Sequence, residues 1–280
     1  MTDPQPGRML PPVPIPPATY DQVVWTHLKA FEGAVDRIYT DGKGIPTMGA
    51  GNALAVIGQD RSWSLRPAAE IGGEIRGDPL RPYRFSAEEW QRLTLCLQAL
   101  NQGALHQAQA LIPPFAPGHE TPALNRFGFT LDESRIQAQT KAKWSAARRA
   151  VLGDILAEAL RRDWSKDVTE AYAGSYQEVG LASVRYNIGV GRATPKATAA
   201  LLDGDRAALW YEIACNTNPP SNGTSRDGIA RRRLAEARLA CGDLAGWGPA
   251  DHAALQRIMA ANAEQVAAYR RAVPGVLPFP

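Results

Sequence analysis

The chain has 280 residues, of which 45% are hydrophobic and 21% are charged. This balance is close to the average of globular proteins, so it excludes wholesale disorder and a coiled-coil rod. The net charge of +3 is too small to indicate nucleic-acid binding, and no apolar run approaches the roughly 18 residues that a membrane span needs.

Residues 1–18 are rich in proline and lack a periodic hydrophobic pattern, which predicts an arm or linker ahead of one domain at 19–280. This start has no unbroken apolar stretch and does not match a signal peptide. We therefore expect synthesis in the cytoplasm without a signal peptide. We also expect the arm to bury little apolar area, so that its removal leaves the fold intact.

The first predicted helix has its cap at Thr19 or Asp21 and runs through Phe31, where Gly33 stops it and leaves Glu32 at its end. The pattern then changes to that of a β-hairpin, because Asp-Gly and Gly tolerate the positive φ of tight turns. Its expected strands and turn are 37–39, 45–48 and Asp41-Gly42-Lys43-Gly44.

Residues 53–85 hold many Gly, Pro and Arg without a sustained period, and we interpret them as a long insertion. Ser86 and Glu89 form a capping box ahead of a helix, and Asp132 opens a long helix that is expected to end near Trp164. Shorter helices are predicted at 175–188, 195–202, 206–215, 227–241 and about 250–271. The fold class is therefore α+β, with one small hairpin sheet near the N-terminus and helices elsewhere.

Two carboxyl groups and one hydroxyl are spaced so that a hairpin folding back across a helix end brings them together. Glu32 ends the helix, Asp41 lies in the hairpin turn and Thr47 lies in the returning strand. Glycosidic cleavage needs one carboxylic acid for the leaving oxygen and one carboxylate for the water or the developing cation. Glu32, beside Phe31 and the helix core, is better placed to stay protonated than Asp41 in a solvated turn.

Three segments carry motifs in a fixed order: Phe31-Glu32-Gly33 with Tyr39-Thr40-Asp41-Gly42-Lys43-Gly44-Ile45-Pro46-Thr47-Met48-Gly49-Ala50-Gly51, then Ser183-Val184-Arg185-Tyr186-Asn187-Ile188-Gly189, then Gly228-Ile229-Ala230-Arg231-Arg232-Arg233-Leu234-Ala235-Glu236. The first resembles the Glu-Gly, Tyr-x-Asp-x-x-Gly-x-x-Thr and Gly-x-Gly signature of the phage-type lysozymes, glycoside hydrolase family 24. The other two are similar to that family's Tyr-Asn-x-Gly segment and its Gly-Leu-x-x-Arg-Arg-x-x-Glu helix.

The resemblance implies a lysozyme-like fold with a small β-hairpin lobe, a larger helical lobe and a cleft between them. It implies a muramidase that cleaves the β-1,4 bond between N-acetylmuramic acid and N-acetylglucosamine in peptidoglycan. In that reaction Glu32 would be the general acid, Asp41 would position the attacking water or stabilise oxocarbenium character, and Thr47 would hold the water by its hydroxyl.

The candidate substrate-binding residues are Tyr39, Tyr186, Asn187 and Arg231. An aromatic ring packs on a sugar face and an amide bonds to N-acetyl groups, which suits Tyr186 and Asn187, although core packing is the alternative for both.

The arginine block raises a separate question, because one of its members approaches the catalytic glutamate in the family. Successive helical residues point in different directions. We therefore expect one of Arg231, Arg232 and Arg233 to face the cleft and the others to be solvated. The sequence does not say which one.

The chain departs from the family pattern in two places. Asn52 follows the Gly-x-Gly, where family members commonly have His, so a contact behind the catalytic residues is expected to differ. The insertion at 53–85 has no ready counterpart and leaves the strand that carries Thr47, so we expect it to run beside the cleft and to use Trp63 and Tyr83 for contacts.

No cofactor and no metal are predicted, because the four histidines are scattered without an i, i+4 pair. The three cysteines are an odd number without a C-x-x-C pair, which favours buried reduced thiols. A Cys215–Cys241 bridge is the alternative in an oxidising compartment.

The predicted partner is peptidoglycan, with no nucleic acid and no membrane span, and the protein is expected to be a monomer. Two alternatives stay open, namely a lytic transglycosylase, which typically lacks the partner carboxylate, and a catalytically degenerate wall-binding module.

The expected setting is the periplasm, which the enzyme reaches by release as a phage endolysin or by injection as a bacteriolytic effector toxin. The proline-rich start and the insertion suit the effector slightly better. An effector implies a secretion-machine carrier and a periplasmic immunity protein as further partners.

Overall fold

The computed structural model describes residues 9–115, 126–189, 191–217 and 226–272. The chain divides into two compact units. We call Trp25–Ala142 the sheet unit and Met1–Val24 with Lys143–Pro280 the helical unit. Mixed α and β structure, mostly helical and with small antiparallel sheets, confirms the α+β class.

The sheet unit contains the end of α1 (Pro17–Glu32) and two small antiparallel sheets. Its first sheet has the strands β1 (Val35–Thr40), β2 (Pro46–Gly49) and β3 (Asn52–Ala53), and its second has β4 (Ala55–Ile57) and β5 (Trp63–Leu65). Tyr39 pairs with Thr47 across β1 and β2. The predicted helix end and hairpin are confirmed.

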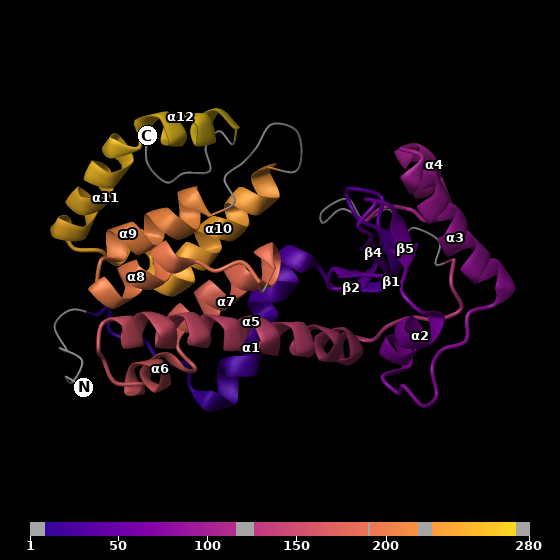
Figure 1. Cartoon of the computed structure of the whole chain (residues 1–280), viewed down its shortest axis with the longest axis horizontal. Coiled ribbons are helices and arrows are strands. Elements are labelled where there is room, and N and C mark those ends of the chain that lie inside the picture. The colour runs from indigo at the N-terminus through magenta and orange to yellow at the C-terminus, as the bar shows by residue number, and fades with distance from the viewer. Residues whose placement is uncertain (1–8, 116–125, 190, 218–225, 273–280) are drawn as a thin grey trace. The chain divides into compact units, whose positions relative to one another are not determined.

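Helices α2 to α4 follow the strands in the sheet unit, and α3 packs on β5 and on α4 (Figure 1). They are α2 (Ala68–Arg76), α3 (Ala87–Asn101) and α4 (Leu105–Leu111). The capping box of α3 is confirmed, since the Ser86 hydroxyl accepts from the Glu89 N–H and the Glu89 carboxylate accepts from the Ser86 N–H. Residues 53–85 lacked a period in the sequence, yet they form a strand pair and a helix.

The helical unit contains the long helix α5 (Glu133–Arg161) from Lys143 onward, and within this unit α10 packs extensively on α7 (Figure 1). Its other elements are α6 (Asp167–Tyr172), α7 (Tyr176–Ile188), α8 (Pro195–Asp203), α9 (Arg206–Tyr211), the π-helical turn η1 (Glu212–Asn216), α10 (Arg226–Cys241), the 3-10 turn η2 (Leu244–Gly246), α11 (Pro249–Ala261) and α12 (Ala263–Ala272).

Most of the predicted helices are confirmed, with four differences. α1 begins at Pro17, so the expected caps Thr19 and Asp21 lie inside it. α5 ends at Arg161 and not near Trp164. The helix expected at 206–215 changes into a π-helical turn after Tyr211. The single helix expected at 250–271 is two helices, because Asn262 ends α11 and its side-chain amide donates to the Ile258 carbonyl at 2.8 Å.

The proline-rich start packs on the helical unit over the part that is described. Leu10 and Ile15 are buried, and the N–H of Ile15 donates to the Gly174 carbonyl at 2.9 Å. The N–H of Tyr176 donates to the Val13 carbonyl at 3.0 Å. The expectation that the arm buries little apolar area is therefore wrong for residues 9–16, while residues 1–8 lie outside the described residues.

The three cysteines lie in the interior of the protein. All three are free and buried, and burial raises the pKa of Cys96 and Cys215 to about 12.

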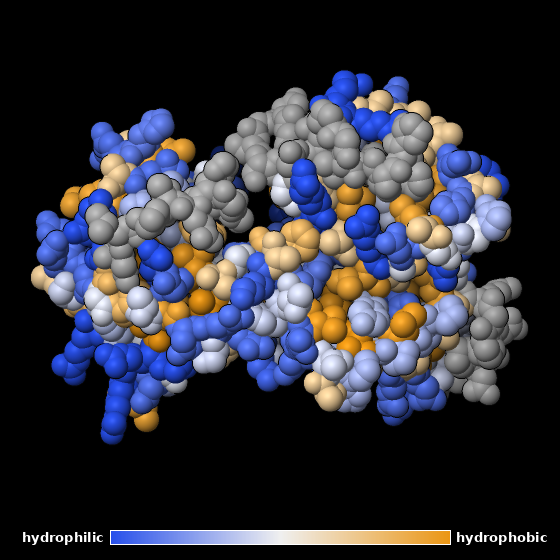
Figure 2. Space-filling model, turned by 180° about the vertical axis from the view of Figure 1, so that it is seen from behind, coloured by the Kyte–Doolittle hydropathy of each residue, from blue (hydrophilic) through white to orange (hydrophobic). Residues whose placement is uncertain are grey.

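On the face in Figure 2, hydrophobic residues reach the surface in patches between hydrophilic ones. None of the helices in the described ranges has the length and hydropathy to span a bilayer.

The burial of Ile15 predicts that its truncation destabilises the fold. Ile15→Ala should lower the free energy of unfolding by about 2–4 kcal/mol, because it removes buried methyl groups and leaves a cavity. Val13→Ala is the matched control, since Val13 is 51% exposed in the same segment. Thermal melts followed by circular dichroism compare the two, and equal melting temperatures would contradict the packing described here.

Candidate functional site

Glu32 is placed by the end of α1. Gly33 follows with a φ of +73°, which ends the helix and turns the chain toward β1. A Cβ at Gly33 would lie 3.2 Å from the Phe115 ring, so glycine also suits the packing there. The glutamate therefore leaves a rigid helix at the point where the backbone changes direction.

Asp41 lies in the hairpin turn, and its carboxylate helps to close that turn. Its Oδ1 accepts hydrogen bonds from the N–H groups of Lys43 and Ile45, each at 2.9 Å. The Asp41 N–H donates to the Ile45 carbonyl at 3.0 Å. All of the hydrogen bonds to the Asp41 carboxylate within the described residues reach Oδ1, so Oδ2 keeps its capacity to accept.

Thr47 lies opposite Tyr39 in the β1–β2 register, so both side chains lie on one face of the sheet. It is buried, and its hydroxyl donates to the Ile45 carbonyl at 2.9 Å. With its proton committed in this way, the hydroxyl oxygen offers lone pairs to another donor.

The turn between β2 and β3 brings the backbone against Glu32. Gly51 has a φ of +74°, and a Cβ there would lie 2.7 Å from Glu32 Oε2, so the carboxylate occupies the space that any side chain at this position would need. The positive φ favours glycine at this position, and the close approach of Glu32 adds to that preference.

The charges of Glu32 and Asp41 also act on Tyr39. Burial raises the pKa of Tyr39 above its usual value, and the nearby charges of Glu32 and, to a smaller degree, Asp41 raise it further. A hydrogen bond with the Gly51 backbone opposes this shift. Tyr39 thus interacts with Glu32, with Gly51 and, more weakly, with Asp41, and it pairs with Thr47 across the strand ladder.

This arrangement has the parts that acid-assisted cleavage of a glycosidic bond requires. One carboxyl group lies at a helix end against backbone, and a second lies in a hairpin turn with one oxygen open. Carboxyl groups in different environments can divide the roles of acid and carboxylate.

The arginine block of the helical unit differs from expectation. Arg231 is exposed, as a solvated residue would be, but Arg232 and Arg233 are both buried. The expectation that two of the three arginines are solvated is wrong. The fully buried Glu236 pairs with the guanidinium groups of both Arg232 and Arg233. The Ser183 hydroxyl donates to the same carboxylate at 2.6 Å.

The other candidates of the helical unit lie beside this charge cluster. Tyr186 is 2% exposed, and Lys143 Nζ lies 4.0 Å from its ring centroid. These contacts favour the packing role that the sequence left open. Asn187 is exposed, and its Oδ1 accepts a hydrogen bond from Arg233.

Asn52, where the family pattern has His, makes a contact that sequence reasoning missed. Its side-chain amide donates to Glu74 Oε2 at 2.8 Å, and Glu74 lies on α2 within the insertion. Of the aromatic residues expected to make contacts, Tyr83 is half-buried and its hydroxyl donates to Glu89 at 2.7 Å.

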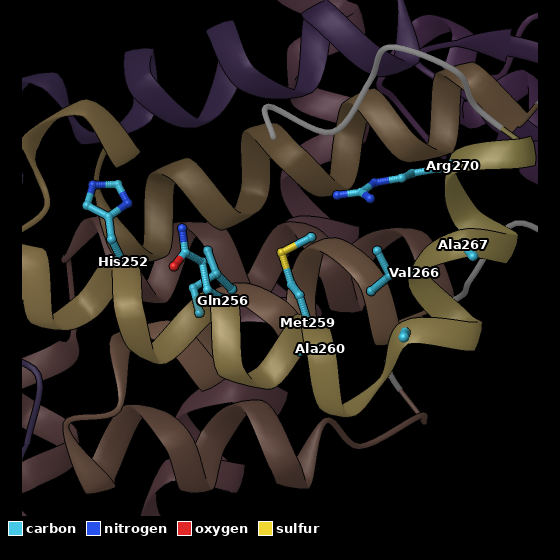
Figure 3. Close-up of a pocket in the computed structure, with 9 residues that line it drawn as sticks. His252, Gln256, Met259, Ala260, Val266, Ala267 and Arg270 are labelled. Atoms are coloured by element: carbon cyan, nitrogen blue, oxygen red, sulfur yellow. The ribbon is translucent and has the colours of Figure 1, made fainter. Parts of the chain in front are cut away.

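A pocket of about 360 Å³ lies between α11 and α12 (Figure 3). Leu255, Met259 and Val266 are among its apolar residues, and His252 and Arg270 are its titratable ones. A pocket lined without a carboxyl group cannot supply the acid and base of glycosidic cleavage. No group of three or more metal-ligating side chains occurs in the described ranges.

Comparison of this chain with protein-family models, with curated proteins and with solved structures finds no match in any of the three.

The buried charge cluster predicts a large effect on stability. Glu236→Gln should lower the free energy of unfolding by about 3–5 kcal/mol, because it leaves two buried guanidinium groups without their carboxylate. Arg231→Ala on the exposed side of α10 is the control and should change it by no more than about 0.5 kcal/mol. Chemical denaturation measures both, and similar values would show that the cluster is not buried in solution.

Proposed function

We propose that this protein is a peptidoglycan muramidase of lysozyme-like fold that hydrolyses the β-1,4 bond between N-acetylmuramic acid and N-acetylglucosamine. The observation that carries the proposal is the approach of the Glu32 carboxylate to Gly51, beside Tyr39, whose pKa also responds to the charge of Asp41. These residues belong to the segment that resembles the phage-type lysozyme signature.

In the proposed mechanism, the Glu32 carboxylic acid donates its proton to the glycosidic oxygen as the bond to the anomeric carbon breaks. The open Oδ2 of Asp41 holds the attacking water or faces the positive charge that develops on the sugar. The Thr47 oxygen accepts a hydrogen bond from that water, since its own proton is donated to Ile45.

We assign roles to the four candidate substrate-binding residues by how exposed their side chains are. Asn187 and Arg231 are exposed polar residues of the helical unit, and their amide and guanidinium groups suit N-acetyl and carboxylate groups of a glycan. Tyr39 and Tyr186 are 7% and 2% exposed, so we assign them to the support of Glu32 and of the charge cluster, and not to sugar stacking.

The lytic transglycosylase is the nearest alternative, and Asp41 favours hydrolysis over it. Such an enzyme closes the muramic acid ring on itself and needs no carboxylate to handle water, whereas here a second carboxylate keeps one oxygen open. A degenerate wall-binding module would keep the fold without this pair of carboxyl groups.

We further propose that the enzyme acts in the periplasm, after synthesis in the cytoplasm and release as an endolysin or injection as an effector toxin. A secretion-machine carrier and a periplasmic immunity protein are the partners that the second setting would require.

The first test is the identity of the products and their dependence on Glu32. Purified protein should release muropeptides with free reducing ends from Gram-negative sacculi, and Glu32→Gln should reduce the rate by about a thousandfold or more because the transferable proton is lost. Glu88→Gln, in the exposed first turn of α3, is the control and should retain wild-type activity.

Mass spectrometry of the products decides between the alternatives. Anhydro products would identify a transglycosylase, and binding to sacculi without any product would identify a wall-binding module. Retention of more than a tenth of the wild-type activity by Glu32→Gln would reject Glu32 as the acid.

The second test uses the contact between Gly51 and Glu32. Gly51→Ala and Gly103→Ala both place alanine at a φ of +74°, so both should lose about 1–2 kcal/mol of stability. Only the Cβ at position 51 meets the Glu32 carboxylate, whereas nothing lies within 4 Å of a Cβ at position 103. Sacculus hydrolysis should therefore fall at least tenfold more in Gly51→Ala, and equal losses would contradict this role of the turn.

A further inference from the structure

The turn that faces Glu32 is held from outside the hairpin. It runs from Gly49 to Asn52, and Gly51 lies against the Glu32 carboxylate. A two-residue strand follows it, so the ladder that fixes β3 is short: Thr47 pairs with Ala53 and Met48 with Asn52. Such a short strand needs other contacts to fix the turn before it.

Asn52 provides the first of these contacts. Its side-chain amide donates to Glu74 Oε2 at 2.8 Å, which ties the residue next to Gly51 to α2. Both groups are partly buried, so water competes less for this hydrogen bond than it would at an exposed site.

Arg66 holds the carboxylate that Asn52 uses. Its side chain is 13% exposed and forms ion pairs with Glu74 and with Glu70. The same guanidinium donates to the Ala53 carbonyl at 3.1 Å. Arg66 therefore joins β3 to α2 directly, in parallel with the Asn52–Glu74 hydrogen bond.

Gln139 of α5 contacts both sides of this connection. Its Nε2 donates to the Glu74 carbonyl at 3.2 Å. A Cβ at Gly49 would lie 2.5 Å from Gln139 Oε1, so the start of the turn packs against the same side chain.

We propose that Glu74 is a positioning residue of the proposed muramidase: through Asn52 it fixes the Gly49–Asn52 turn, and thereby the backbone of Gly51 against the Glu32 carboxylate. This inference rests on the proposed function and adds a role for the 53–85 segment in it. The segment braces the catalytic turn from behind.

Glu74 has two properties that substitution can separate: its negative charge and its capacity to accept a hydrogen bond. Asn52 is neutral and needs an acceptor only, whereas Arg66 pairs with the charge. Glu74→Gln keeps an oxygen for Asn52 and loses the charge, and Glu74→Ala loses both. A role in positioning therefore predicts that glutamine rescues the alanine variant.

The experiment compares Glu74→Ala, Glu74→Gln, Asn52→Ala and Glu70→Ala. Glu70 pairs with the same arginine at 2.6 Å, so Glu70→Ala is the matched control for the ion pair. Kinetics on soluble glycan fragments should show a kcat about ten- to a hundredfold lower in Glu74→Ala and Asn52→Ala, with KM nearly unchanged, since a small misplacement of the acid affects the transition state most. Glu74→Gln and Glu70→Ala should stay within about threefold of wild type.

Amide hydrogen exchange gives a readout that does not depend on activity. Peptides covering residues 49–53 should exchange faster in Glu74→Ala and Asn52→Ala and as in wild type in Glu70→Ala. Unchanged exchange in the first two variants, or a glutamine variant as slow as the alanine variant, would overturn the proposal. A wild-type protein that cleaves no glycan while the exchange pattern holds would reject the muramidase and leave the bracing of the turn by Glu74 established.

Discussion

The carboxylate of Glu32 lies against the backbone of Gly51 at a distance that leaves no space for a side chain. This contact joins three parts of the sheet unit that are separate in sequence: the end of α1, the face of β1 that carries Tyr39, and the turn that leads into β3. Each part is fixed independently, by a helix, by a strand ladder and by the Asn52–Glu74 contact. The backbone on these sides of the Glu32 carboxylate is therefore fixed, which suits the precise positioning that the proposed proton transfer to a bound substrate would need.

The local signals of the chain were sufficient for the elements that carry the candidate site. Gly33 after an amphipathic run, Asp41-Gly42 between β-type segments, and Ser86 with Glu89 each act through backbone geometry within a few residues, so they are readable without tertiary information. Tertiary packing determines the structure of two segments whose sequence pattern does not indicate it. Leu10 and Ile15 look like parts of a solvated arm until Gly174 and Tyr176 pair with their segment, and residues 53–85 gain strands because α3 packs on β5.

Charge burial is the clearest case in which sequence reasoning fails. Three consecutive arginines usually indicate a solvated helix face, because an unpaired buried guanidinium is costly. Glu236 changes this result, since its position three and four residues later lets one carboxylate pair with Arg233 and Arg232 on the same helix. Ser183 donates to that carboxylate from α7, and Asn187 accepts from Arg233. The spacing was visible in the sequence, but the presence of α7 over it was not.

Asp41 shows how one side chain can serve both the fold and the chemistry. Its Oδ1 accepts two backbone N–H groups and closes the hairpin, which is a common structural use of aspartate in turns. Asparagine would close the turn equally well, because its side chain offers the same acceptor. The turn therefore does not require a charge, and the charge of Asp41 contributes to the raised pKa of Tyr39. The hairpin does not need this carboxylate, and the hydrogen bonds in the described ranges leave its Oδ2 to accept, as the proposed hydrolase requires and a binding module does not.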